Sequence, residues 1–95
     1  MKKNIKNIFS LKIVQKNSKE DTILDVRSTY DQKKNPLILK KTKIKLMPFY
    51  KIQSEYHQLS KEKSYLLYCE KGIMSRLQAF FLIEKGFKKI KILKK

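Results

Sequence analysis

Cys69 is the only cysteine in the sequence, and its neighbours along the chain are those of a reactive thiol. It ends the apolar run Tyr65–Cys69, which predicts a buried strand, and a short loop then leads into a predicted helix over Ser75–Lys85. Backbone N–H groups of such a loop and of the first helical turn form a nest that binds anions. Because a negative sulfur meets these dipoles and the positive helix end, we expect Cys69 to be held as a thiolate.

Other residues of the loop favour the same chemistry. Gly72 permits the backbone angles that a tight wrap around the sulfur requires. We expect Ser75 to cap the helix and to point its hydroxyl at the sulfur, and Lys71 and Arg76 to add positive potential. The alternative is that Cys69 is a small buried residue that packs at the end of a strand, the commonest fate of a lone cysteine.

Strand and helix signals alternate along the chain, which predicts how this loop is positioned. The order indicates an α/β fold, a small three-layer domain with a mostly parallel central sheet flanked by helices. Cys69 then lies at the carboxyl end of its strand, where ligand sites of parallel sheets are found. Lys43–Met47 alternates polar and apolar residues, as expected near a sheet edge, and Pro48 stops it. The predicted strands are Ile8–Val14, Thr22–Val26, Lys43–Met47, Tyr65–Cys69 and Lys89–Leu93; the predicted helices are a short one after the second strand, Phe49–Leu59, and Ser75–Lys85, which Gly86 ends.

The length of the chain predicts one domain. A chain of 95 residues buries roughly 60 to 65% of its unfolded surface, enough for one small core, so we expect a single domain over residues 1–95 with residues 1–7 as a loose polar end. The longest uncharged apolar run spans five residues, whereas a membrane-spanning helix needs about 20. Met1–Ser10 lacks the features of a secretory signal. We expect a cytoplasmic protein, and a lone cysteine fits a reducing compartment.

The formal net charge is +16, from 24 basic and eight acidic residues. Arg27 and Arg76 are the only arginines, and the other basic residues are Lys. A bias in base composition would produce this skew on a tolerant surface, and a surface so charged would also attract RNA or another acidic partner. Both interpretations stay open. Recognition of a base sequence is not favoured, because it usually depends on Arg.

Several segments resemble one family of sulfur-transfer domains. Cys69–Arg76 has the pattern Cys-x-x-Gly-x-x-Ser-Arg, which resembles the active-site loop of rhodanese-like sulfurtransferases, and Leu24–Arg27 resembles the Leu-Asp-Val-Arg strand end that opens those domains. Over about residues 20 to 95 the sequence is similar to the C-terminal rhodanese-like domain of the tRNA 4-thiouridine synthases. The segments that carry this closer resemblance are Asp25–Ser28, Met47–Lys51, Tyr68–Ala79 and Glu84–Phe87.

The resemblance implies a persulfide carrier. In the family, the cysteine that matches Cys69 receives a sulfane sulfur from a cysteine desulfurase and passes it to uridine in tRNA, and the same domain supports sulfur transfer for the thiamine thiazole. Asp25 and Arg27 are implied to lie beside it, as a structural ion pair or in a supporting catalytic role. No cofactor is implied other than the covalent persulfide. The residues implied to form the persulfide-binding loop are Glu70, Lys71, Gly72, Ile73, Met74, Ser75 and Arg76.

Parts of the family's full-length enzymes have no counterpart in these residues. The family has an ATP-using domain with a Gly-Gly phosphate loop and a second, resolving cysteine, whereas the only glycines here are Gly72 and Gly86 and the only cysteine is Cys69. We therefore expect a partner, an ATP-using tRNA thiolation enzyme or tRNA itself, to accept the sulfur.

Three other functions need to be considered. A thiosulfate sulfurtransferase unrelated to tRNA would use Cys69 in the same way, and a basic RNA-binding module without catalysis would depend on the lysines alone. A Cys-x5-Arg phosphatase needs its Arg six positions after the cysteine, but Arg76 is seven positions after Cys69. His57, the only histidine, has no second ligand nearby in sequence, so we expect no metal site.

Overall fold

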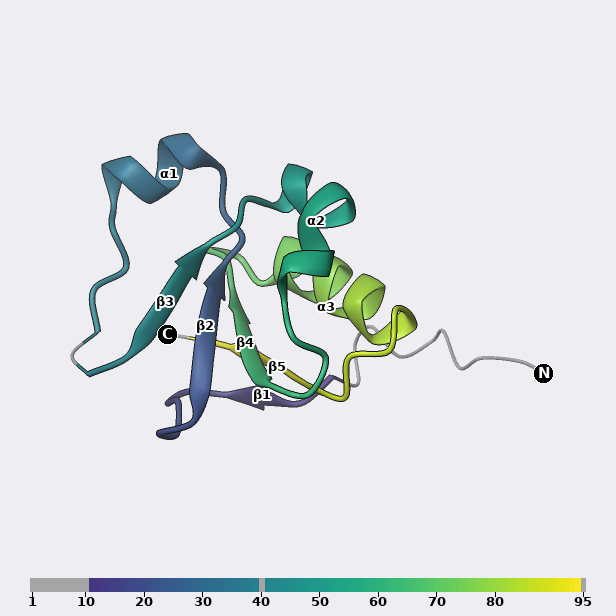
Figure 1. Ribbon diagram of the computed structural model, residues 1–95. Helices are drawn as coiled ribbons and strands as arrows, with labels where there is room; N and C mark the ends of the chain where they lie inside the picture. The colour runs from purple at the N-terminus through teal and green to yellow at the C-terminus, as the bar shows by residue number, and fades with distance from the viewer. Residues whose placement is uncertain (1–10, 40, 95) are drawn as a thin grey trace.

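Five parallel strands form one sheet at the centre of the computed structural model, which describes residues 11–39 and 41–94 (Figure 1). The strand order is β1-β5-β4-β2-β3, and each neighbouring pair runs parallel. The predicted α/β fold is therefore confirmed. The elements in chain order are β1 Ile13–Val14, β2 Asp21–Asp25, α1 Thr29–Lys34, β3 Lys43–Leu46, α2 Phe49–Glu55, the 3-10 helix η2 Tyr56–Gln58, β4 Ser64–Tyr68, α3 Ile73–Glu84 and β5 Lys89–Leu93.

Most predicted elements agree with the observed ones to within one or two residues. β5 has its predicted bounds, and β2 and β4 each begin and end one residue early, so that Cys69 is the first residue after β4. β1 is shorter than the predicted Ile8–Val14; residues 1–10, with the expected loose end at 1–7, lie outside the described residues. The helix predicted over Phe49–Leu59 is divided into α2 and η2.

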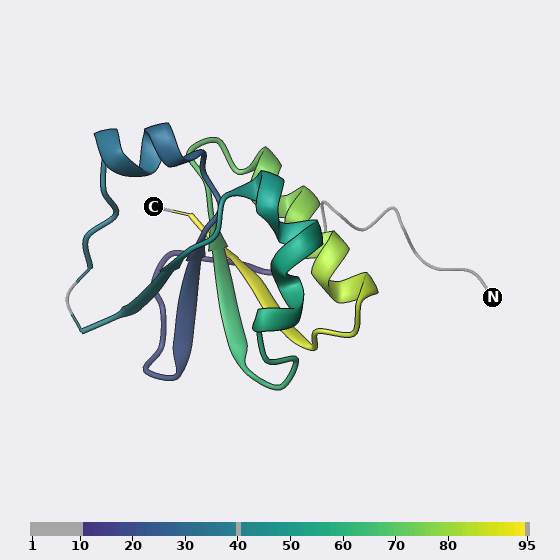
Figure 2. The same cartoon turned by 45° about the horizontal axis from the view of Figure 1, so that its top comes forward.

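Helices α2 and α3 lie side by side over one face of the sheet (Figures 1 and 2). The apolar residues of the central strands β2 and β4 alternate between this face and the other, which is why both strands read as nearly continuous apolar runs. The core on the helical face is formed by apolar side chains of three strands and two helices. It includes Leu24 of β2, Val26 directly after β2, Leu67 of β4, Ile92 of β5, Ile52 of α2, and Ala79 and Leu82 of α3.

The opposite face is covered mainly by the segment between α1 and β3. Ile23, Leu66 and Leu93 are buried there against Leu37 and Leu39 of that segment. α1 itself lies above the carboxyl ends of β2 and β3 in Figure 1, near the end of the sheet that carries Cys69. The carboxyl ends of β2 and β4 are therefore paired in the sheet and packed on both faces.

β3 is an edge strand, as its alternating sequence predicts. Its residues Lys43, Lys45 and Leu46 are exposed and Ile44 is half-buried. Charged residues on an edge oppose its pairing with another molecule.

A glycine-dependent motif ends α3, as predicted. Gly86 has φ +101°, and its N–H donates to Ile83 while the N–H of Phe87 donates to Leu82. These two bonds satisfy carbonyls of the last helical turn, and only glycine adopts such a φ without strain.

Candidate active site

The sulfur of Cys69 accepts two backbone hydrogen bonds at the tip of β4. The N–H of Gly72 lies 3.1 Å and the N–H of Ser75 3.2 Å from Sγ. Cys69 is 9% exposed, so the sulfur lies at the bottom of its loop and close to the surface. Both donors therefore point at one atom, which is the geometry of a backbone nest.

The loop is held by hydrogen bonds that converge on the carbonyl oxygen of Gly72. The Ser75 hydroxyl donates to it at 3.2 Å and Nη1 of Arg76 at 2.8 Å. Gly72 has φ +82°, and a Cβ added there would lie 2.7 Å from Nη1 of Arg76. The N–H of Gly72 is thus aimed at the sulfur by a backbone conformation that a larger residue would strain.

The structure corrects the predicted role of Ser75. Helix α3 begins at Ile73 with Gly72 as its N-cap residue, so Ser75 is the third residue of the helix and does not cap it. Its hydroxyl donates to Gly72 and not to the sulfur, which receives the Ser75 backbone N–H instead. Ile73 and Met74, expected in the loop, form the first helical turn. The physical reason is the left-handed Gly72, which turns the chain into the helix two residues earlier.

Asp25 and Arg27 form a buried ion pair beside the loop. Nε and Nη2 of Arg27 donate to the two carboxylate oxygens of Asp25 at 2.9 and 2.8 Å, and the Arg27 N–H donates to the same carboxylate. The hydrogen bond with Asp25 raises the pKa of Arg27, although burial acts in the opposite direction. The guanidinium lies 5.1 Å from the ring centre of Tyr68, the residue before Cys69. The pair therefore braces the neighbouring ends of β2 and β4.

Gln32 of α1 is a further buried polar residue that the sequence analysis does not single out. Its Nε2 donates to the carbonyl oxygens of both Asp25 and Arg27, at 2.9 Å each. Because these carbonyls lie at the end of β2 and just after it, Gln32 holds the backbone of the segment that contains Arg27. Helix α1 has six residues and no apolar stripe, so its sequence gives no sign that one glutamine is buried.

Cys69 lines two hollows that differ in size and in their other residues. The narrow one, of about 130 Å³, is bounded by the ends of β1 and β5 and contains Lys71, Arg76 and Lys94. The wide one, of about 440 Å³, is open and is lined by Arg27, Phe49 and Met74 among others. Glu70 and Lys71 line both hollows, Gly72 and Arg76 the narrow one, and Ile73 and Met74 the wide one; Ser75 and Asp25 are buried behind them.

The described part of the chain has no group of three or more His, Cys, Asp or Glu side chains placed to hold a metal ion. Within the same residues, no helix has the length and apolar character needed to cross a membrane.

Comparison with known families agrees with the geometry of the site. A family model described as a rhodanese-like domain matches residues 10–95. The chain belongs to the rhodanese-like domain family. The resemblance inferred from the Cys69–Arg76 loop is thereby confirmed, and so is the expected kinship with tRNA sulfurtransferases, as the following relatives show.

Curated relatives of this rhodanese-like domain are named tRNA sulfurtransferase. One from Photorhabdus laumondii is 53% identical over 72 residues, which cover 76% of this chain and 15% of that protein. One from Proteus mirabilis is 40% identical over 91 residues, which cover 96% of this chain and 19% of that protein. The chain therefore spans less than a fifth of the length of these relatives.

Solved structures share the rhodanese-like fold at lower identity. An NAD-dependent persulfide reductase from A. fulgidus has a TM-score of 0.74 and 23% identity, covering 94% of this chain and 16% of that one. A rhodanese-related protein from Thermoplasma volcanium has a TM-score of 0.65 and 21% identity, covering 79% of this chain and 71% of that one. At this level of identity the likeness shows the fold.

Proposed function

We propose that this rhodanese-like domain carries a sulfane sulfur as a persulfide on Cys69 and passes it on for the synthesis of 4-thiouridine in tRNA. The observation that carries the proposal is the pair of N–H groups, from Gly72 and Ser75, aimed at a nearly buried sulfur between two hollows. Such donors stabilise a thiolate both when it attacks and when it leaves. The sulfur of a persulfide carrier must act as the nucleophile when it is loaded and as the leaving group when the outer sulfur is passed on.

The loading step balances without a cofactor. The Cys69 thiolate attacks the outer sulfur of a donor persulfide, R–S–SH, and a new S–S bond forms to Cys69. The S–S bond of the donor breaks, and R–S⁻ leaves with its electron pair. The persulfide proton is then lost to solvent, which leaves an anionic sulfur about 2 Å from Sγ, near the cations Lys71 and Arg76.

The kinship with tRNA sulfurtransferases supports the donor and acceptor that we propose. The proposed donor is a cysteine desulfurase, whose persulfide has the form R–S–SH. The proposed acceptor is a uridine of tRNA activated by an ATP-using enzyme, because replacing its oxygen with sulfur requires a leaving group that Cys69 does not supply. The outer sulfur of the persulfide bonds to the uridine carbon as the activated oxygen leaves. A thiol of the partner then attacks Sγ of Cys69, so that a disulfide forms and the sulfur stays on the uridine. We place these reactions in the cytoplasm. Sulfur supply to the thiamine thiazole is a second outlet for the same persulfide.

A second candidate function is a thiosulfate sulfurtransferase unrelated to tRNA. The observation that favours it is the narrow hollow beside Cys69, where Lys71, Arg76 and Lys94 surround a space that suits a small oxyanion. Here Cys69 would attack the outer sulfur of thiosulfate, and sulfite would leave.

Intact mass spectrometry tests the proposal. The purified domain is incubated with a cysteine desulfurase and cysteine, and separately with thiosulfate. We expect the mass to increase by one sulfur atom with the desulfurase, to return to its first value after reduction with dithiothreitol, and to stay constant in Cys69→Ala.

Complementation assigns the acceptor. The persulfidated domain is added to tRNA, ATP and a tRNA sulfurtransferase from which the rhodanese-like domain has been removed. We expect 4-thiouridine to form with wild-type domain and not with Cys69→Ala. Thiolation supported by Cys69→Ala would overturn the carrier role, and loading by thiosulfate alone would favour the second candidate.

A further inference from the structure

A large hollow lies at the end of the sheet opposite Cys69. It has a volume of about 720 Å³ and collects residues from the amino ends of all five strands. This follows from the topology: parallel strands all begin at one edge of a sheet. The residues that line it are Lys12, Ser18, Glu20, Asp21, Thr22, Lys43, Glu62, Lys63, Ser64, Lys88, Lys89, Ile90 and Lys91.

Lysines dominate this hollow, which we call the basic hollow. Six lysines and three carboxylates line it, so its net formal charge is three positive. One of the carboxylates, Asp21, is 5% exposed and accepts hydrogen bonds from Ser18 and Ser64, so its oxygens are engaged within the protein and are not free to contact a ligand. Glu20 and Glu62 are exposed and are the opposing charges. A concave surface with this excess concentrates positive potential where an anion would lie.

The types of side chain identify the class of anion. Among the described residues that line the basic hollow, none is aromatic and none is Arg. Bases would be bound by aromatic stacking or by Arg forks, whereas phosphates are bound by lysines and hydroxyl groups. The hollow supplies six lysines together with the hydroxyls of Ser18, Thr22 and Ser64.

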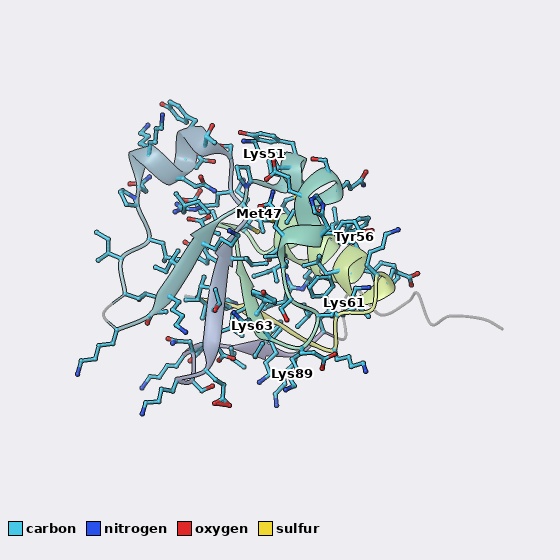
Figure 3. The ribbon with its side chains drawn as sticks, viewed as in Figure 1. Met47, Lys51, Tyr56, Lys61, Lys63 and Lys89 are labelled. Atoms are coloured by element: carbon cyan, nitrogen blue, oxygen red, sulfur yellow. The ribbon has the colours of Figure 1, made fainter. Side chains whose placement is uncertain are left out.

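We propose that the basic hollow binds the sugar–phosphate backbone of RNA without recognising its sequence. The choice of RNA as the polyanion rests on the function proposed above, whose acceptor is a tRNA. The basic hollow is separated from Cys69 by the length of a five-residue strand, about 17 Å. Figure 3 shows Lys63 and Lys89 at the lower end of the sheet, and Met47 and Lys51, which follow the carboxyl end of β3, higher up. Cys69 directly follows the carboxyl end of β4. RNA binding and sulfur loading are therefore separable.

Neutralising three exposed lysines of the basic hollow tests the proposal. The triple variant Lys63→Gln, Lys88→Gln and Lys89→Gln is compared with a control of equal charge, Lys33→Gln, Lys34→Gln and Lys51→Gln, which changes exposed lysines of α1 and α2. Binding of an unmodified tRNA transcript is measured by fluorescence anisotropy over a range of salt concentrations.

We expect the hollow variant to bind about tenfold or more weakly at 0.1 M salt, and the slope of log affinity against log salt to decrease by about 2 to 3. The control is expected to keep the wild-type slope to within about one. Equal losses in both variants would mean that total charge alone binds RNA, and would overturn the proposal. An unchanged slope in the hollow variant would overturn it as well.

Two further measurements distinguish an error in the proposed RNA site from an error in the proposed persulfide function. Polyglutamate is tested in place of tRNA; if the hollow variant loses affinity for polyglutamate and keeps it for tRNA, the basic hollow is a protein-binding site and the proposal is wrong. Cys69→Ala is expected to bind tRNA as wild type does, and the hollow variant to form the persulfide at the wild-type rate. Failure of the persulfide assay alone would overturn the proposed function and leave the basic hollow as an RNA site.

Discussion

Sγ of Cys69 receives its hydrogen bonds from the backbone of Gly72 and Ser75, so substitutions at these positions test different properties. At Gly72 a side chain changes the backbone conformation that aims the N–H. At Ser75 a substitution removes the hydroxyl but keeps the N–H. If the backbone provides the anion site, a substitution at Gly72 reduces sulfur loading and a substitution at Ser75 leaves it nearly unchanged.

Gly72→Ala is expected to reduce persulfide formation strongly. The added Cβ would lie 2.7 Å from Nη1 of Arg76, and φ +82° is strained for alanine. This strain lowers the unfolding free energy by about 1 to 2 kcal/mol. If the backbone relieves the strain by changing φ, the N–H of residue 72 moves away from the sulfur. Urea unfolding measures the loss of unfolding free energy, and mass spectrometry after desulfurase treatment measures the yield of persulfide.

Gly86→Ala is the matched control for this variant. Gly86 also has a left-handed φ, +101°, but its Cβ would meet only the Lys61 side chain at 3.5 Å and lies far from the loop. We expect a similar loss of stability and a wild-type yield of persulfide from the folded protein. Equal yields in both variants would show that the Gly72 conformation does not matter for the chemistry.

Ser75→Ala is expected to cost stability more than sulfur loading. The lost hydrogen bond to the Gly72 carbonyl is worth about 0.5 to 1.5 kcal/mol, and Arg76 still donates to that oxygen. The N–H to the sulfur is unchanged, so the amount of persulfide and its lifetime should stay within about twofold of wild type. Loss of loading in a folded variant would assign the hydroxyl a role at the sulfur after all.

At the scale of elements, the site depends on how the end of β2 is attached to α1. Gln32 bonds the carbonyls of Asp25 and Arg27, and the N-cap residue Ser28 accepts a hydrogen bond from the N–H of Asp31. A helix of six residues gains little stability by itself. These tertiary contacts therefore keep α1 at the rim of the wide hollow.

Gln32→Met is expected to lower the unfolding free energy by about 1 to 3 kcal/mol, because the variant keeps a similar side-chain length but leaves the Arg27 carbonyl without this donor. The Asp25 carbonyl keeps the N–H of Met47. Gln53→Met, at an exposed position of α2, is the control and should change stability by less than about 0.5 kcal/mol. Chemical denaturation measures both, and equal values would show that the buried amide contributes nothing.

At the scale of the whole molecule, acid unfolding depends in part on Asp21. Burial acts to raise the pKa of this carboxyl, but hydrogen bonds from Ser64 and Ser18 and the charge of Lys91 together lower it below its ordinary value. A carboxyl with a lowered pKa in the folded state stabilises the protein above its ordinary pKa, near 4, and this stabilisation is lost as pH falls through the lowered value.

Asp21→Asn is therefore expected to be less stable than wild type by about 1 to 3 kcal/mol at pH 7, with a difference that shrinks as the pH is lowered from 5 to 2. Unfolding free energies at a series of pH values give this difference directly. Two curves that stay parallel down to pH 2 would contradict the assigned role of the Asp21 carboxylate.

Much of the fold and the site could be predicted because the informative patterns are local. The loop from Cys69 to Arg76 is continuous in sequence, and the central strands are short apolar runs with few alternatives. The start of α3 was harder to predict, because Ser75 is a common N-cap residue whereas the true N-cap is a left-handed Gly72. The burial of Gln32 depends on tertiary packing, and no periodic pattern of apolar residues in α1 indicates it.

The position of β5 in the sheet has a consequence for the order in which the strands assemble. Among the described strands β5 comes last in sequence, yet it lies between β1 and β4. Before residues 89–93 join the sheet, the strands β2, β3 and β4 can already pair, but one edge of β4 stays open and β1 has no neighbour in the sheet. The sheet closes only when β5 inserts, and any delay in this step prolongs the exposure of an apolar edge to other chains.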